Sequence, residues 1–117
     1  MNKQQKFEIN YTCFETWDDV PENYRQLMKE ARLAKDGSYA PYSNFNVGAA
    51  LLLNNGKIIH GSNQENASYP IGFCAERTAL SAAASLASHE KIKAIAITCS
   101  SAHNPVTTPA APCGICR

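Results

Sequence analysis

The sequence predicts a single α/β domain, residues 1–117, in which helices cover the faces of a mixed β-sheet. Three observations favour this class: an early segment with a helical period, two strand-like segments around an Asn-Gly turn, and an alanine-rich helix that leads into a nearly continuous apolar run. A helix followed by a strand that is apolar on both faces indicates a βαβ crossover. With 44% hydrophobic and 18% charged residues, the composition excludes a disordered chain.

Residues 1–21 are expected to form an N-terminal extension. Apolar and polar residues alternate from Phe7 to Cys13, which is the period of a half-buried strand, so we expect this segment to add an edge strand to the sheet. Cys13, like Cys99 further along the chain, is then expected to be a buried and unreactive thiol.

The first helix is predicted between Pro21 and Gly37. Apolar residues there recur at the spacing of one helical face, at Tyr24, Leu27, Met28, Ala31 and Ala34, and the glycine supplies the stop signal. Residues 38–45 read as a loop rich in aromatic residues. Two antiparallel strands, residues 47–53 and 57–60, are predicted on either side of Asn54-Asn55-Gly56, because Asn-Gly is the strongest short hairpin signal.

The second helix is predicted from about Ala75 to Ser88, where frequent alanines would let it lie close against a sheet. Residues 91–99 are rich in apolar and β-branched residues and predict a strand buried on both faces. Residues 100–111 are expected to form a long loop.

Charge and hydropathy narrow the possible partners. The formal net charge is +1 and the basic residues are scattered, so the electrostatic surface of a nucleic-acid binder is absent and a small neutral ligand suits the chain better. The longest apolar run, residues 47–53, is far too short to span a membrane. The start of the chain is polar and lacks a signal-peptide core, so we expect a cytoplasmic protein without membrane contact.

The spacing of the cysteines indicates a metal site. Cys74 with Glu76, and Cys113 with Cys116, supply three thiolates and one acid to a zinc site. Zinc held by three protein ligands keeps a fourth position for water, and a carboxylate two residues from a ligand can move that water's proton. Two other interpretations stay open: a redox dithiol formed by Cys113 and Cys116, and a structural zinc site completed by Cys13 or Cys99. Neither interpretation gives Glu76 a chemical role.

The segments Cys74-Ala75-Glu76 and Pro112-Cys113-Gly114-Ile115-Cys116 resemble the signature of the zinc-dependent cytidine deaminase family. The resemblance implies a three-layer α-β-α sandwich, one zinc ion per chain, and hydrolytic deamination of cytidine and deoxycytidine in pyrimidine nucleoside salvage. Zinc hydroxide would attack C4 of the base while Glu76 shuttles the protons. The backbone amide of Ala75 would hold the pyrimidine O2, and Arg77 would hydrogen-bond to the ligand sulfurs.

Two further segments resemble the same family. Residues 39–50 are similar to its first motif, in which Phe45 would contact the pyrimidine face. Residues 61–69 are similar to its second, in which Asn63 and Glu65 would bind the ribose 3′-hydroxyl. The alternative substrate is a modified cytosine nucleoside such as a nucleoside antibiotic, whereas editing of RNA or DNA is disfavoured because stacking and basic channel surfaces are not evident. The three histidines, which lie outside every motif, receive no ligand role.

The resemblance runs from about Tyr24 to Arg117, and family members continue beyond the last cysteine with a helix and further sheet structure. We therefore expect the chain to be a fragment that lacks these C-terminal elements. The family also assembles as a homotetramer whose subunits share residues between active sites, and this is the expected assembly of the full-length form.

Overall fold

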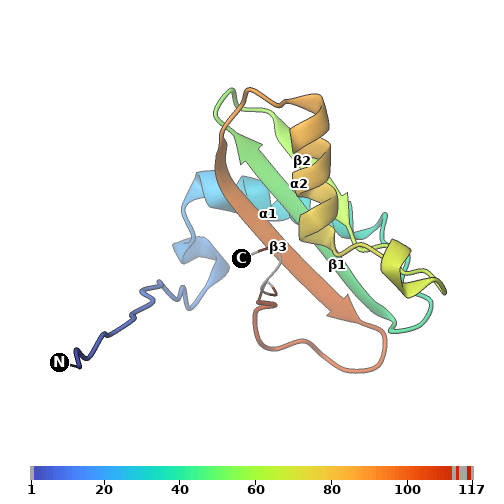
Figure 1. Cartoon of the computed structure of the whole chain (residues 1–117), viewed down its shortest axis with the longest axis horizontal. Helices are drawn as coiled ribbons and strands as arrows, with labels where there is room; N and C mark the ends of the chain where they lie inside the picture. Colours follow the sequence, from blue (N-terminus) through green and yellow to red (C-terminus); the bar gives the residue numbers. More distant parts are fainter. Residues whose placement is uncertain (1, 112, 114–115, 117) are drawn as a thin grey trace.

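Two helices enclose a three-stranded sheet in the computed structural model, which describes residues 2–111, 113 and 116 (Figure 1). The elements are η1 (Trp17–Asp19), α1 (Glu22–Lys35), β1 (Phe45–Leu53), β2 (Ile58–Ser62), η2 (Tyr69–Ile71), α2 (Ala75–Leu86) and β3 (Ile92–Ser101). Both predicted helices, the hairpin and the strand after α2 are confirmed, with bounds that differ from the predicted ones by a few residues. No helix among the described residues is long and apolar enough to cross a bilayer.

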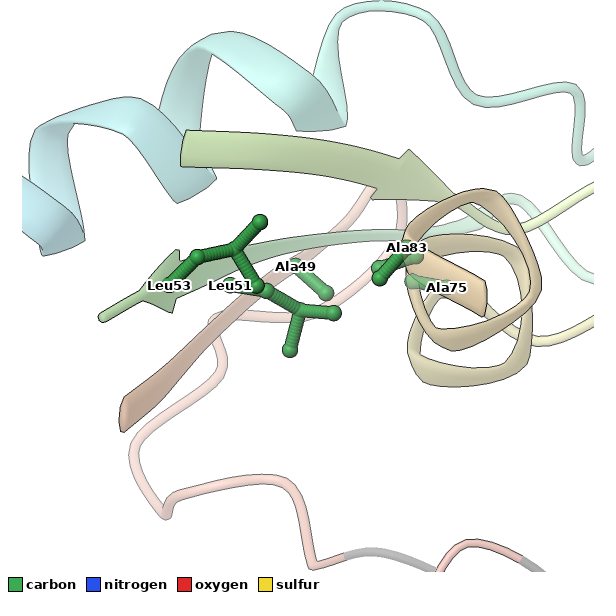
Figure 2. Packing of buried hydrophobic residues seen from close by; sticks show 6 residues of the cluster. Ala49, Leu51, Leu53, Ala75 and Ala83 are labelled. Carbon is green, nitrogen blue, oxygen red and sulfur yellow. The ribbon is translucent and has the colours of Figure 1, made fainter. Parts of the chain in front are cut away.

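The layers follow from the alternation of side chains along β1. Ala49, Leu51 and Leu53 point to one face and pack against three alanines of α2, spaced four residues apart, at positions 75, 79 and 83 (Figure 2). Ala50 points to the other face and packs against Leu27 and Ala31 of α1. The helices thus lie on opposite faces of the sheet, so the expected α-β-α sandwich is confirmed.

The strand order is β2-β1-β3. The hairpin places Ala50 opposite His60, and its Asn-Gly turn puts Gly56 at φ 86°, a conformation that glycine adopts without a steric penalty. β1 also pairs antiparallel with β3, so every hydrogen-bonded strand pair among the described residues is antiparallel and the mixed sheet that we expected is not formed there. The crossover nevertheless exists, because β2 and β3 both run antiparallel to β1 and are therefore parallel to each other with β1 between them.

Two glycines allow both helices to approach the sheet closely. A Cβ on Gly48 would overlap the carbonyl oxygen of Ala31 in α1, and a Cβ on Gly61 would overlap the carbonyl oxygen of Ala75 in α2. Because Gly61 lies under the first residue of α2, it sets how near that end of the helix comes to the sheet.

The predicted N-terminal edge strand is wrong. Residues 2–14 have no regular secondary structure and extend away from the body of the molecule (Figure 1), with Phe7 87% exposed. Alternation gives a segment the pattern of a strand but supplies no neighbour to accept its hydrogen bonds. Cys13 is exposed for the same reason, in contrast to the buried thiol that we expected.

β3 is less buried than its sequence predicts. Ile95 is 44% exposed although it lies opposite the buried Leu51 in the β1–β3 pair. The cause is the position of α2, which packs mainly on β2 and β1 and leaves part of this face over β3 uncovered. Cys99, on the same strand, is half-buried rather than buried.

Candidate active site

The first predicted metal ligand forms the N-terminal cap of α2. Cys74 has extended backbone angles, φ −76° and ψ 162°, and its Sγ accepts a hydrogen bond from the backbone N–H of Arg77 at 3.4 Å. Thr78 closes the first turn, because its hydroxyl donates to the carbonyl oxygen of Cys74 at 2.9 Å. The N-terminal end of a helix stabilises negative charge, so a thiolate is favoured at this position.

Three potential ligands meet beside this helix end. The Sγ atoms of Cys74 and Cys116 and a carboxylate oxygen of Glu76 all lie within 4.8 Å of one another, and the two Sγ atoms are 3.4 Å apart. Two thiolates at Zn–S distances of about 2.3 Å in a tetrahedral site would lie about 3.8 Å apart, so a small shift would fit them to zinc. Glu76 is buried, at 9% exposure, which directs its carboxylate into the site rather than to solvent.

The acid–base properties of the cluster also suit a cation. Burial raises the pKa of the Cys116 thiol to about 12, and the neighbouring Cys74, Glu76 and Cys113 raise it in the same direction. Several groups that become negative on losing a proton are thus held close together, and a divalent cation would relieve their mutual repulsion. Cys113 lies near enough to affect Cys116 but is not in the group of ligand atoms within 4.8 Å.

A pocket of about 860 Å³ opens beside this cluster. Its volume is in the range of small-molecule sites. Seven of the nine residues with a predicted role line this pocket: Phe45, Asn63, Glu65, Cys74, Ala75, Glu76 and Arg77. Residues from three separate predicted motifs therefore meet at one site, as their order along the chain led us to expect. Of the other two predicted residues, Cys116 contacts Cys74, and Cys113 lies near enough to Cys116 to raise the pKa of its thiol.

Phe45 enters the pocket at the first residue of β1. The residue before it, Asn44, has φ 55°, in the left-handed region that asparagine tolerates better than most residues. Its backbone N–H donates to the carbonyl oxygen of Ala40 at 3.0 Å, and its carbonyl oxygen accepts from Ala102 at 3.1 Å. This turn brings the chain into β1 with the Phe45 ring at the pocket wall.

Asn63 joins the end of β2 to the start of β1. Its side-chain oxygen accepts from the N–H of Val47 at 2.9 Å, and its side-chain nitrogen donates to the carbonyl oxygen of Phe45 at 2.8 Å. An amide group carries two donor hydrogens, so the side chain retains one for a ligand.

Glu65 organises the loop that leads into Phe45. One carboxylate oxygen accepts from the backbone N–H groups of Tyr42 and Ser43 at 3.0 and 3.1 Å. A side-chain hydrogen bond with Ser43 is the main cause that lowers the pKa of Glu65 below its usual value, and the backbone donors add to it. The carboxylate is therefore held in its ionised, acceptor form.

Arg77 adopts a different arrangement from the one predicted. Its backbone N–H, rather than its guanidinium, is the group that donates to the Cys74 sulfur. The guanidinium lies over the ring of Phe73, 4.7 Å from the ring centroid, in a cation–π contact.

Sequence reasoning missed two contributors, Gln64 and Phe73. Gln64 connects the loops that carry the site through backbone pairs on both sides, and Phe73 supports Arg77. An aromatic residue directly before a predicted helix-capping cysteine was a usable signal for Phe73, whereas no pattern in the sequence marks Gln64.

Fold and site together define an α/β protein of three layers with a thiol-rich candidate metal site at the start of a helix, open to a small-molecule pocket. The chain belongs to the cytidine and deoxycytidylate deaminase family, since the family model for the "cytidine and deoxycytidylate deaminase zinc-binding region" matches residues 21–117.

Individual relatives agree with this family. The chain is 47% identical over 93 residues to a cytidine deaminase of Halalkalibacterium halodurans, which covers 80% of this chain and 66% of the relative. It is 42% identical over 92 residues to a cytidine deaminase of Sporosarcina psychrophila, with 79% and 63% covered. The crystal structure of cytidine deaminase from Burkholderia pseudomallei superimposes with a TM-score of 0.66 at 45% identity, over 83% of this chain and 72% of that one. The chain thus spans slightly less than two thirds of the length of these curated relatives.

Proposed function

We propose that this protein catalyses zinc-dependent hydrolytic deamination of cytidine and deoxycytidine to uridine and deoxyuridine. The observation that carries the proposal is the meeting of a buried Glu76 with the thiols of Cys74 and Cys116 at the edge of a pocket with an aromatic wall. Relatives and solved neighbours that are named cytidine deaminases support the same reaction.

Cys74, Cys113 and Cys116 are the residues that would hold one zinc ion per chain. When bound, zinc would supply a water molecule whose pKa is lowered toward neutrality. Three thiolates leave the site with a net charge of about minus one, which the N-terminal end of α2 helps to offset. The backbone N–H of Arg77, which donates to the Cys74 sulfur, would contribute to this effect.

Glu76 is the proposed proton carrier. Its carboxylate takes a proton from the water and gives it to N3 of the cytosine ring as the water oxygen bonds to C4. It then takes the remaining proton from the new C4 hydroxyl and delivers it to the amino group, which leaves as ammonia when the C4–N bond breaks and the C4 carbonyl forms. The overall reaction consumes one water and releases ammonia and the uracil nucleoside. Burial of Glu76 beside the cysteines supports this role, because the carboxylate is kept within reach of the reacting atoms and away from bulk solvent.

The nucleoside would be oriented by residues from several segments that line the pocket. The ring of Phe45 would pack on the pyrimidine, and the backbone N–H of Ala75 at the start of α2 would donate to its O2. Asn63 would donate its remaining amide hydrogen to the ribose 3′-hydroxyl, and the ionised Glu65 would accept a hydrogen bond from the same group. Each of these residues lines the pocket.

We further propose that the full-length form is a homotetramer that acts in cytoplasmic nucleoside salvage. Exposed apolar side chains at Tyr42, Tyr69 and Ile71, near the mouth of the pocket, support an association surface there.

The test is zinc content and turnover measured on the same preparation. We expect about one zinc per chain and a change in ultraviolet absorbance as cytidine loses its amino group, with ammonia formed in equal amount. Zinc-loaded protein that leaves cytidine and deoxycytidine unchanged would overturn the proposed reaction. Zinc-free protein after refolding with excess metal would overturn the ligand assignment.

A further inference from the structure

Gln64 lies where three segments of the site come together. Its backbone exchanges two hydrogen bonds with Phe73, at 2.8 and 2.9 Å, directly before the cysteine that caps α2. On its other side it forms a parallel bridge with Tyr39, in which the N–H of Tyr39 donates to Asn63 and the N–H of Glu65 donates to Tyr39. A short ladder therefore runs from the loop after α1, through Gln64, to the start of α2.

The side chain of Gln64 strengthens only one half of this ladder. Its amide nitrogen donates to the carbonyl oxygen of Gly37 at 3.0 Å and to the hydroxyl of Ser62 at 3.2 Å. A primary amide has two donor hydrogens, and these two bonds use both. The side chain thus ties the loop after α1 to the end of β2, whereas the pair with Phe73 depends on the backbone alone.

The two residues beside Gln64 are the ones to which we assign sugar binding. Asn63 clamps the start of β1 through Phe45 and Val47, and Glu65 holds the backbone of Tyr42 and Ser43. Both side chains leave the loop in the same direction, because residues at i−1 and i+1 of an extended segment lie on one face. A shift of Gln64 would therefore move both of them together.

We propose that Gln64 is a positioning residue that fixes Asn63 and Glu65 relative to the metal-bearing end of α2, and that it sets the affinity for the sugar of the nucleoside. Its side chain fastens the ladder at Gly37, so the loop that contacts the sugar cannot drift from the pocket. The reacting groups stay where they are when this tie is lost, because the Phe73 pair and the cap of α2 do not involve the Gln64 side chain.

The kinetic consequence rests on the proposed function. Loss of the tie should raise KM for cytidine about tenfold, which corresponds to the displacement of positioning groups by a fraction of an ångström, and should leave kcat within about twofold. Zinc content should not change, because the ligands lie beyond the unchanged Phe73 pair.

Two variants remove the donors while they keep the length of the side chain: Gln64→Met and Gln64→Glu. The matched control is Gln26→Met, on the exposed side of α1. Backbone hydrogen exchange provides a measurement that does not depend on catalysis. In both variants the amides of Tyr39 and Glu65 should exchange about tenfold faster, and the amide of Leu51 in the core should be unchanged. The Leu51 amide thereby separates a local loosening from a general loss of stability.

The outcomes distinguish this inference from the proposed function. A chain that does not deaminate cytidine in any variant would count against the proposed function, and the exchange rates would still decide the role of Gln64. Unchanged exchange at Tyr39 and Glu65 would overturn the inference, as would a loss of kcat with KM preserved. Faster exchange throughout, Leu51 included, would overturn it as well, because the residue would then contribute general stability only.

Discussion

The two faces of the sheet are built from similar parts but are used differently. On one face, α1 contacts all three strands and its buried residues pack on Ala50 and Ala96. On the other, α2 packs mainly on β2 and β1, and its first turn carries Cys74 and Glu76 into a pocket at the edge of the sheet. A glycine sets the distance between helix and sheet on each face, Gly48 for α1 and Gly61 for α2.

The comparison shows how one helix can be core along its length and an active-site element at its end. The buried alanines of α2 fix its position through close contact with β1 (Figure 2). The chemistry is then concentrated at the residues of the first turn, where unpaired N–H groups favour negative ligands. The face covered by α1 has no comparable group of metal-binding side chains among the described residues.

The largest effect is expected from removal of the buried carboxylate on the α2 face. Glu76→Gln should lower kcat about 10⁴-fold, at the upper end for general acid–base catalysis, because one group carries every proton transfer. Zinc content should be kept. The matched change on the α1 face is Glu30→Gln, which alters a partner of His60 at 2.6 Å and should leave kcat within about twofold. Substantial turnover by the first variant would exclude Glu76 as the proton carrier.

A second contrast concerns two cysteines, one at the cap of α2 and one on β3. Cys74→Ser keeps a hydrogen-bond acceptor at the N-cap, where serine is favoured, so α2 should remain intact. The loss of its thiolate should lower zinc affinity by more than the roughly 10–100-fold that follows loss of an outer hydrogen-bond partner. Cys99→Ser, on β3, should bind zinc as the unaltered protein does. Zinc affinity measured with a competing chelator checks both, and equal affinities would refute the assignment of Cys74.

The sequence predicted this contrast only in part. The hydrophobic spacing of residues 24–34 and the Asn-Gly turn identified α1 and the hairpin, because both signals are local. The strand predicted from the alternation between Phe7 and Cys13 was wrong, because a strand must pair with a neighbour and the local pattern does not reveal whether one is present. The exposure of Ile95 was missed for a related reason: which strands a helix covers is decided by tertiary packing.

The site shows the same limit. Cys74, Glu76, Phe45, Asn63 and Glu65 could be singled out because they stand in motifs, and the structure brings all five to one pocket. The backbone ladder through Gln64 could not be predicted, because its hydrogen bonds involve main-chain atoms that every residue possesses. The orientation of Arg77 depends on the nearby Phe73 ring, a contact that no spacing rule specifies.

Gly48 and Gly61 allow a test of the two faces of the sheet in which a smaller effect is expected. Gly48→Ala and Gly61→Ala should each lower the free energy of unfolding by about 1–3 kcal/mol, because the added Cβ overlaps helix backbone that must move away. Only Gly61→Ala should also weaken zinc binding, since the backbone it displaces belongs to Ala75 at the start of α2. Chemical denaturation and zinc titration, both at a temperature where each variant is folded, make the measurement. Equal zinc affinities for the two variants would show that the α2 end tolerates the shift.

The smallest expected effect is a dependence of stability on pH that comes from Glu65, which lines the pocket and belongs to neither helix. The pKa of Glu65 is lowered in the folded protein by its bonds with Ser43 and Tyr42, so its ionisation favours folding above the usual value of 4.5 and this contribution is lost as pH falls through the lower folded pKa. The difference in Tm between the unaltered protein and Glu65→Gln should therefore be constant above pH of about 5.5 and should shrink below about 4.5. Because both proteins contain the same other titratable groups, the contributions of those groups cancel in the difference in Tm. A difference that stays constant down to pH of about 3 would mean that the charge of the Glu65 carboxylate does not hold the Tyr42–Ser43 loop.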